Sequence, residues 1–69
     1  MNEIYKQLEG INLDLFYCVT IWTRELTLQG NINPEVIDYC KKQFGITGFS
    51  LSEQGYLEAA MGHIKIVLT

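Results

Sequence analysis

The feature that most constrains the fold is an alternation of apolar and polar residues across residues 13–32, which changes phase once. Apolar residues occupy odd positions before the phase change and even positions after it: Leu13, Leu15, Tyr17, Val19 and Ile21, then Leu26, Leu28 and Ile32. A repeat of two residues is typical of strands that bury one face, so the segment predicts two strands. With a turn at Thr23 and Arg24, the two strands pair their residues on one face: Ile21 with Leu26, Val19 with Leu28, Tyr17 with Gly30, and Leu15 with Ile32. We therefore expect a β-hairpin whose Leu13–Ile21 face belongs to the core.

Residues 34–44 predict a helix with clear signals at both ends. Asn33 suits the N-cap, Pro34 suits the first helical position, and Glu35 lies near the positive end of the helix dipole. The apolar residues form one stripe along such a helix: Val36, Ile37, Cys40 and Phe44. Gly45 can adopt the left-handed conformation that ends it.

Residues 53–61 fit two different structures. A turn that ends at Gly55 would make this segment part of a hairpin. The run Leu-Glu-Ala-Ala-Met instead favours a helix by intrinsic propensity, ended by Gly62. The sequence leaves both structures open and favours the helix.

The remaining segments complete a small α+β fold. Asn2 suits the cap of a short N-terminal helix that ends at Gly10. Two further segments, residues 46–51 and 63–69, predict strands. We therefore expect a single domain over residues 1–69, with a mostly antiparallel sheet of three to four strands and helix 34–44 packed on one face.

The composition indicates a chain with more apolar residues than its interior can hold. Of the 69 residues, 48% are hydrophobic and 19% are charged, and a chain of this size buries only about 60% of the surface that its unfolded form exposes. Part of the apolar content should therefore lie on the surface or in an interface. The net charge of −3, with five scattered basic residues, disfavours binding to nucleic acid, which depends on Lys and Arg.

The N-terminus and the two cysteines predict a cytoplasmic protein. The first residues are polar, without the basic and apolar regions of a signal peptide, and the longest apolar run, residues 15–22, is too short for a membrane helix. In that compartment Cys18 and Cys40 are expected to be free thiols, with a Cys18–Cys40 disulfide as the alternative.

Candidate catalytic and metal-binding residues do not form a recognisable set. His63 is the only histidine, and nothing in the spacing places an oriented partner or a nucleophile near it. Cys18, Cys40 and His63 lack the closely spaced ligand pairs of structural zinc sites. The glycines lack the strand–turn–helix context of a phosphate-binding loop. We therefore expect no catalytic residue, no metal site and no cofactor.

The other face of the hairpin carries an apolar stripe that needs a cover. Its residues are Phe16, Cys18 and Trp22, with Arg24 nearby. Either the chain itself covers this stripe, or a partner protein does, since aromatic residues often anchor interfaces. The candidate interface residues are therefore Phe16, Cys18, Trp22 and Arg24.

These features favour a small protein, not an enzyme, that acts as a regulator or inhibitor by binding another protein and that self-associates as a homodimer or higher oligomer. Binding would use the hairpin aromatics or a sheet edge. One alternative is a ligand-binding or enzymatic domain with a site between subunits, for which the candidate groups are Tyr17, Tyr39, Tyr56 and His63. A further alternative is a binder of single-stranded nucleic acid, which aromatic stacking would allow but the scarcity of basic residues disfavours.

Overall fold

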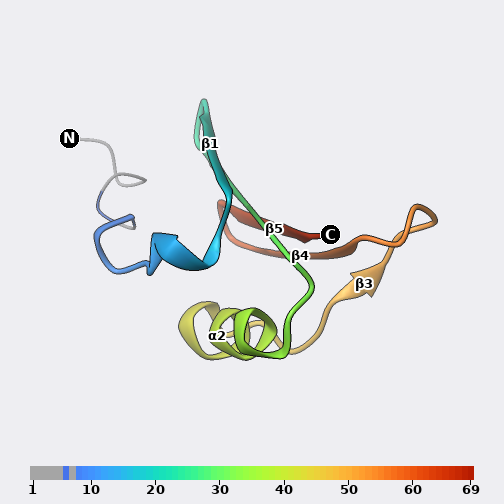
Figure 1. The fold of residues 1–69 in the computed structure, drawn as a ribbon. Helices are drawn as coiled ribbons and strands as arrows, with labels where there is room; N and C mark the ends of the chain where they lie inside the picture. The colour runs from blue at the N-terminus through green and yellow to red at the C-terminus, as the bar shows by residue number, and fades with distance from the viewer. Residues whose placement is uncertain (1–5, 7) are drawn as a thin grey trace.

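The computed structural model describes residue 6 and residues 8–69, which form an α+β fold (Figure 1). The elements follow in chain order: a 3-10 turn η1 (Leu13–Leu15), β1 (Cys18–Trp22), β2 (Glu25–Gly30), α2 (Pro34–Phe44), β3 (Ser50–Leu51), β4 (Leu57–Met61) and β5 (Ile64–Leu68). The expected α+β class is confirmed, with five strands instead of the three to four predicted. The predicted cap at Asn2 lies outside the described residues, whereas Lys6, Leu8 and Glu9 have helical backbone.

The five strands form one mixed sheet in the order β1-β2-β5-β4-β3. β2 and β5 run parallel, and the other three neighbouring pairs are antiparallel. β5 is therefore the central strand, although it comes last in the sequence. In this arrangement Leu28 of β2 lies between Val19 of β1 and Ile66 of β5.

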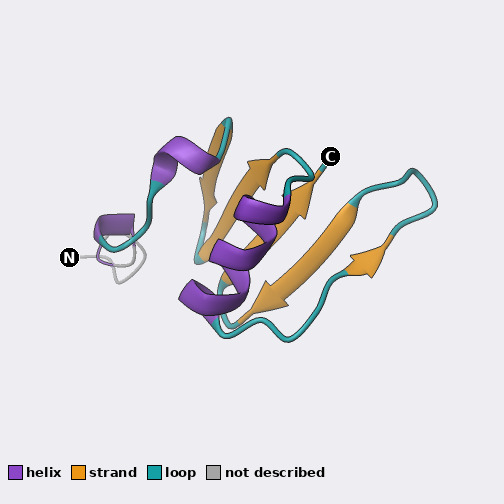
Figure 2. Cartoon of the chain, turned by 60° about the horizontal axis from the view of Figure 1, so that its bottom comes forward, coloured by secondary structure: helices purple, strands orange, loops and turns teal. Residues whose placement is uncertain are grey.

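The core lies between one face of this sheet and α2, which Figure 2 shows lying over that face. Its buried residues come from both layers and from the segment before β1: Ile11, Phe16, Leu26, Leu28, Val36, Cys40, Ile46, Ile64, Ile66 and Leu68. Two hydrogen bonds hold the segment before β1 against α2. The amide of Asn12 donates to the Tyr39 hydroxyl at 2.7 Å, and Gln43 Nε2 donates to the Gly10 carbonyl at 3.1 Å.

The predicted helix is confirmed at both ends. The Asn33 side chain accepts a hydrogen bond from the Glu35 amide at 2.8 Å, as an N-cap residue does. Gly45 has φ +69° and ends the helix in the left-handed conformation that favours glycine. Val36 and Cys40 are buried, and Lys41 and Lys42 lie in the last turn, where their charge stabilises the helix dipole.

The hairpin prediction is confirmed near the turn and is wrong before Cys18. Ile21 opposes Leu26 and Val19 opposes Leu28 as predicted. The ladder ends at the next pair, Cys18 with Gln29, so the predicted pairings of Tyr17 with Gly30 and of Leu15 with Ile32 do not form. Three residues expected in the core are exposed: Leu13, Tyr17 and Ile32.

A local irregularity in β1 explains this change. Cys18 is the register partner of Gln29, and the Tyr17 amide donates to the carbonyl of the same Gln29 at 2.9 Å. Two residues of one strand opposite one residue of the next is the arrangement of a β-bulge, which shifts the alternation by one position. The shift turns Tyr17 outward and Phe16 toward the core.

Gly30 provides the space into which Phe16 packs. A Cβ atom at this position would lie 3.2 Å from both the Leu15 carbonyl oxygen and Phe16 Cδ1, and 3.3 Å from Leu68 Cδ2. Such contacts are closer than packed carbon atoms normally adopt. The absence of a side chain at Gly30 therefore lets the segment before β1 close over the end of β2.

The expected helix over residues 53–61 is wrong, and the hairpin alternative is confirmed. Ser52 and Tyr56 close a turn, since the Ser52 amide donates to the Tyr56 carbonyl at 2.8 Å and Ser52 Oγ accepts from the Tyr56 amide at 2.9 Å. Gly55 has φ +90° within it. The strand predicted over residues 46–51 shortens to Ser50–Leu51.

Candidate functional site

The face of the sheet opposite α2 consists of exposed and half-buried side chains. Its members are Cys18, Thr20 and Trp22 of β1; Glu25, Thr27 and Gln29 of β2; Lys65 and Val67 of β5; Glu58 and Ala60 of β4; and Ser50 of β3. Most are polar, as expected where one face of an antiparallel sheet meets solvent. The large apolar exception is Trp22, whose side chain is 78% exposed.

The structure separates the four predicted interface residues. Cys18 and Trp22 share the open face, with Thr20 between them. Arg24 is exposed in the turn that follows β1. Phe16 is only 8% exposed and packs edge-to-face on Tyr39, with ring centroids 6.4 Å apart. The expectation that Phe16 lies on the open face is therefore wrong, because the bulge at Tyr17 and Cys18 rotates it into the core.

The sequence predicted binding at a sheet edge but did not indicate which strand forms that edge. In the structure, β1 has a free edge. The Leu26 amide donates to the His63 carbonyl at 2.8 Å, so the even-numbered residues of β2 bond to β5. The odd-numbered residues of β2 then bond to β1, where they oppose Cys18, Thr20 and Trp22. Backbone groups alternate in direction along a strand. The N–H and C=O groups of Val19 and Ile21 therefore point away from the sheet, and no strand in the described part of the chain pairs with them.

Apart from the bulge at its Cys18 end, this edge lacks the features that normally prevent strands from pairing with other molecules. β1 reads Cys-Val-Thr-Ile-Trp and contains neither a charged residue nor proline. Natural edge strands are usually protected by charges, by proline, by a bulge or by being very short. The opposite edge is protected in this way, because β3 has only two residues. β1 therefore presents an uncharged, β-prone edge with its only irregularity at the Cys18 end.

Comparison with known proteins gives this chain no relative. Searches of protein-family models, of curated proteins and of solved structures find no match. Over residues 6 and 8–69, no helix is both long and apolar enough to span a membrane. The geometry of the β1 edge is thus the basis for a functional proposal.

Within the single chain, the residues expected for a ligand site between subunits lie near different elements of the fold. The Tyr17 hydroxyl lies 2.9 Å from Thr69 Oγ1, whereas the Tyr39 hydroxyl is bonded to the Asn12 amide. Tyr56 follows the turn before β4, and His63 lies in the turn between β4 and β5. Among the described residues, no three His, Cys, Asp or Glu side chains lie close enough together to hold a metal ion.

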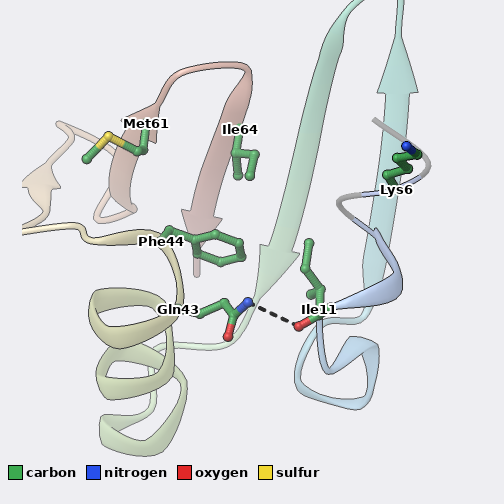
Figure 3. A pocket seen from close by; sticks show the side chains of 7 residues that line it. Lys6, Ile11, Gln43, Phe44, Met61 and Ile64 are labelled. Carbon is green, nitrogen blue, oxygen red and sulfur yellow. Dashed lines mark hydrogen bonds between the residues drawn. The ribbon is translucent and has the colours of Figure 1, made fainter. Parts of the chain in front are cut away.

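A hollow of about 410 Å³ lies between the end of α2, the segment before β1 and the β4–β5 hairpin (Figure 3). Its walls are mixed polar and apolar, with one charged side chain: Lys6, Gly10, Ile11, Gln43, Phe44, Met61 and Ile64. The Gln43 amide already donates to the Gly10 carbonyl. Among the described residues that line it, none carries a carboxylate, thiol, hydroxyl or imidazole group.

Both cysteines are free, as expected, but their surroundings differ. Cys18 is half-buried on the open face, with its Sγ 3.7 Å from Thr20 Oγ1. Cys40 is fully buried between α2 and the sheet. Burial raises the pKa of the Cys40 thiol from 9.0 to about 11, because the thiolate would be poorly solvated there.

This pKa shift predicts a loss of stability at high pH. The unfolded thiol ionises near pH 9.0 and the folded thiol near pH 11. The protonated Cys40 thiol therefore contributes its full share of the unfolding free energy below pH 9. This share, roughly 2–3 kcal/mol, is lost as the pH rises to 11. Urea unfolding between pH 8 and pH 11 measures this loss. We expect Cys40→Ala to remove this part of the pH dependence and Cys18→Ala to keep it; the same slope in both variants would contradict the assignment.

Proposed function

We propose that this protein acts by binding another protein, which adds an extended segment to the free edge of β1. The observation that carries the proposal is the unpaired, uncharged edge strand with an exposed tryptophan at its end. Strand addition is a common mode of recognition, in which backbone hydrogen bonds provide affinity and side chains provide specificity.

Each part of β1 would have a distinct role in this binding. The outward N–H and C=O groups of Val19 and Ile21 would bond to the partner strand. Trp22 would be the anchor, since exposed tryptophans are enriched among residues that dominate binding energy. Arg24 and Glu25 lie at the turn end of the strand, where their opposite charges would select the charge pattern of the partner.

The proposed action is that of a regulator or inhibitor. A protein that binds through one edge strand can occupy a surface on a larger partner without chemistry of its own. We place this action in the cytoplasm, because two free cysteines are typical of a reducing compartment.

The test is a comparison of capture by three immobilised proteins from extracts of the cells that make the chain. Wild type, Trp22→Ala and Leu51→Ala are used, since Leu51 is an exposed apolar residue, 73% accessible, on the opposite edge of the sheet. We expect one protein to be retained by wild type and by Leu51→Ala, and to bind Trp22→Ala about 30-fold more weakly or worse. Equal retention by Trp22→Ala, or retention of no protein by wild type, would refute the proposal.

A further inference from the structure

The backbone N–H and C=O groups that point outward from the free edge of β1 can pair with the same groups of a second copy. Its outward residues, Val19 and Ile21, flank Thr20, which is the midpoint of the strand. Two copies of such an edge can pair antiparallel around a twofold axis perpendicular to the sheet. The helices of both copies would then lie on the same side of one continuous sheet.

In three symmetric registers, backbone N–H and C=O groups that point outward from one copy face outward-pointing groups of the other copy. The twofold axis of these registers passes through Val19, Thr20 or Ile21. An axis at Val19 places Ile21 opposite Tyr17, whose amide is already bonded to Gln29. An axis at Ile21 places Val19 opposite Thr23, which lies in the turn with φ +57°. Only the axis at Thr20 pairs every outward N–H of one copy with an outward C=O of the other.

The same register also pairs the side chains favourably. Trp22 lies opposite Cys18 of the second copy, in a pair without direct backbone hydrogen bonds, where side chains approach closely. Val19 lies opposite Ile21 of the second copy on the side that faces the helices. No charged residue of β1 meets another, because the strand has none. The open backbone groups would be paired in the same step in which Trp22 and Cys18 come into contact across the two strands.

We propose that a second copy of this chain occupies the β1 edge, paired antiparallel about Thr20. This inference rests on the proposed function in that both use the same edge, so the second copy and the partner protein would compete for it. A small chain with limited core volume gains stability from such association.

The test measures self-association by sedimentation of wild type, Thr20→Glu and Thr27→Glu over a range of concentrations. Thr20→Glu would place two carboxylates against each other at the axis, whereas Thr27 is the neighbour of Thr20 one strand inward, opposite Lys65. We expect wild type and Thr27→Glu to dimerise with similar affinity, and Thr20→Glu to dimerise about fivefold more weakly or worse. A mixture of Thr20→Glu with Thr20→Lys should recover the dimer through opposite charges.

The register has its own test in oxidative cross-linking of Thr20→Cys. A pair of cysteines at the axis lies within disulfide distance, so this variant should form a covalent dimer under mild oxidation. Wild type should not, because Cys18 lies opposite Trp22 and not opposite itself. Cross-linking of wild type through Cys18 would overturn this register.

The outcomes separate this inference from the proposed function. A wild type that stays monomeric at all concentrations, while its capture of a protein still depends on Trp22, would overturn the self-pairing and leave the proposed function standing. A dimer weakened by Thr20→Glu and restored by the Glu–Lys mixture, without Trp22-dependent capture, would support the self-pairing and refute the proposed function.

Discussion

Replacement of Leu28 by alanine is expected to lower the free energy of unfolding by about 3–5 kcal/mol, since buried leucines in well-packed cores lose this much. Leu28 is fully buried and lies between Val19 and Ile66 at the centre of the sheet. A chain of this length is stable by only about 3–10 kcal/mol in total. Equilibrium urea unfolding should therefore show a greatly lowered midpoint, and much of the variant should be unfolded on warming.

The matched control is Leu51→Ala. It removes the same atoms from a side chain that is mostly exposed on β3, and its effect should stay within about 0.5 kcal/mol. Similar losses for the two variants would contradict the placement of β2 at the centre of the core.

Phe16→Ala is expected to destabilise the fold by about 3–5 kcal/mol, whereas Trp22→Ala should change stability by less than about 0.5 kcal/mol. Phe16 fills the space above Gly30 and contacts Tyr39, so its removal leaves a cavity where the segment before β1 meets α2. Trp22 is exposed and leaves none. Thermal unfolding of both variants at one low protein concentration measures the difference, because low concentration limits any contribution from association.

Phe16→Leu serves as the control for loss of volume, since leucine retains most of the apolar contact. We expect it to recover a large part of the stability lost in Phe16→Ala. If Trp22→Ala proved the more damaging of the two alanine variants, the assignment of Phe16 to the core and of Trp22 to the surface would be wrong.

The helix and the inner part of the hairpin could be predicted from the sequence because their signals are local. Asn33, Pro34 and Gly45 specify the two ends of α2 through their own side chains and backbone preferences. Around the turn, the alternation of Val19 and Ile21 against Leu26 and Leu28 leaves only one register that places all four on the core face.

The sequence predicted the β4 strand only as the less favoured alternative, because its local preference opposes its final structure. Leu57, Ala59 and Met61 belong to a run with high helix propensity, yet they pair with Leu68, Ile66 and Ile64 of β5. Pairing beside the central strand packs Leu57 and Ala59 against the core, and such tertiary contacts override propensity. The decisive partner lies in another segment, which periodicity within residues 53–61 does not reveal.

Only part of the candidate site could be predicted from the sequence. Trp22 stands out from sequence alone as an aromatic residue on the polar face of the hairpin, and the structure leaves it exposed. Phe16 also occupies an even position, but the bulge at Tyr17 turns its side chain from the open face to the core. A one-residue bulge has no clear sequence signature here, so parity alone misplaced Phe16.

The central position of β5 has a consequence for how the chain is made. β2 needs β5 to pair the backbone groups of its even-numbered residues, yet the ribosome synthesises the two strands at different times. At about 5–20 residues per second, the segment from Gly30 to Leu68 takes on the order of several seconds to translate. During that interval the β1–β2 hairpin exists without the strand that completes its sheet. The complete sheet can therefore form only after β5 has been synthesised.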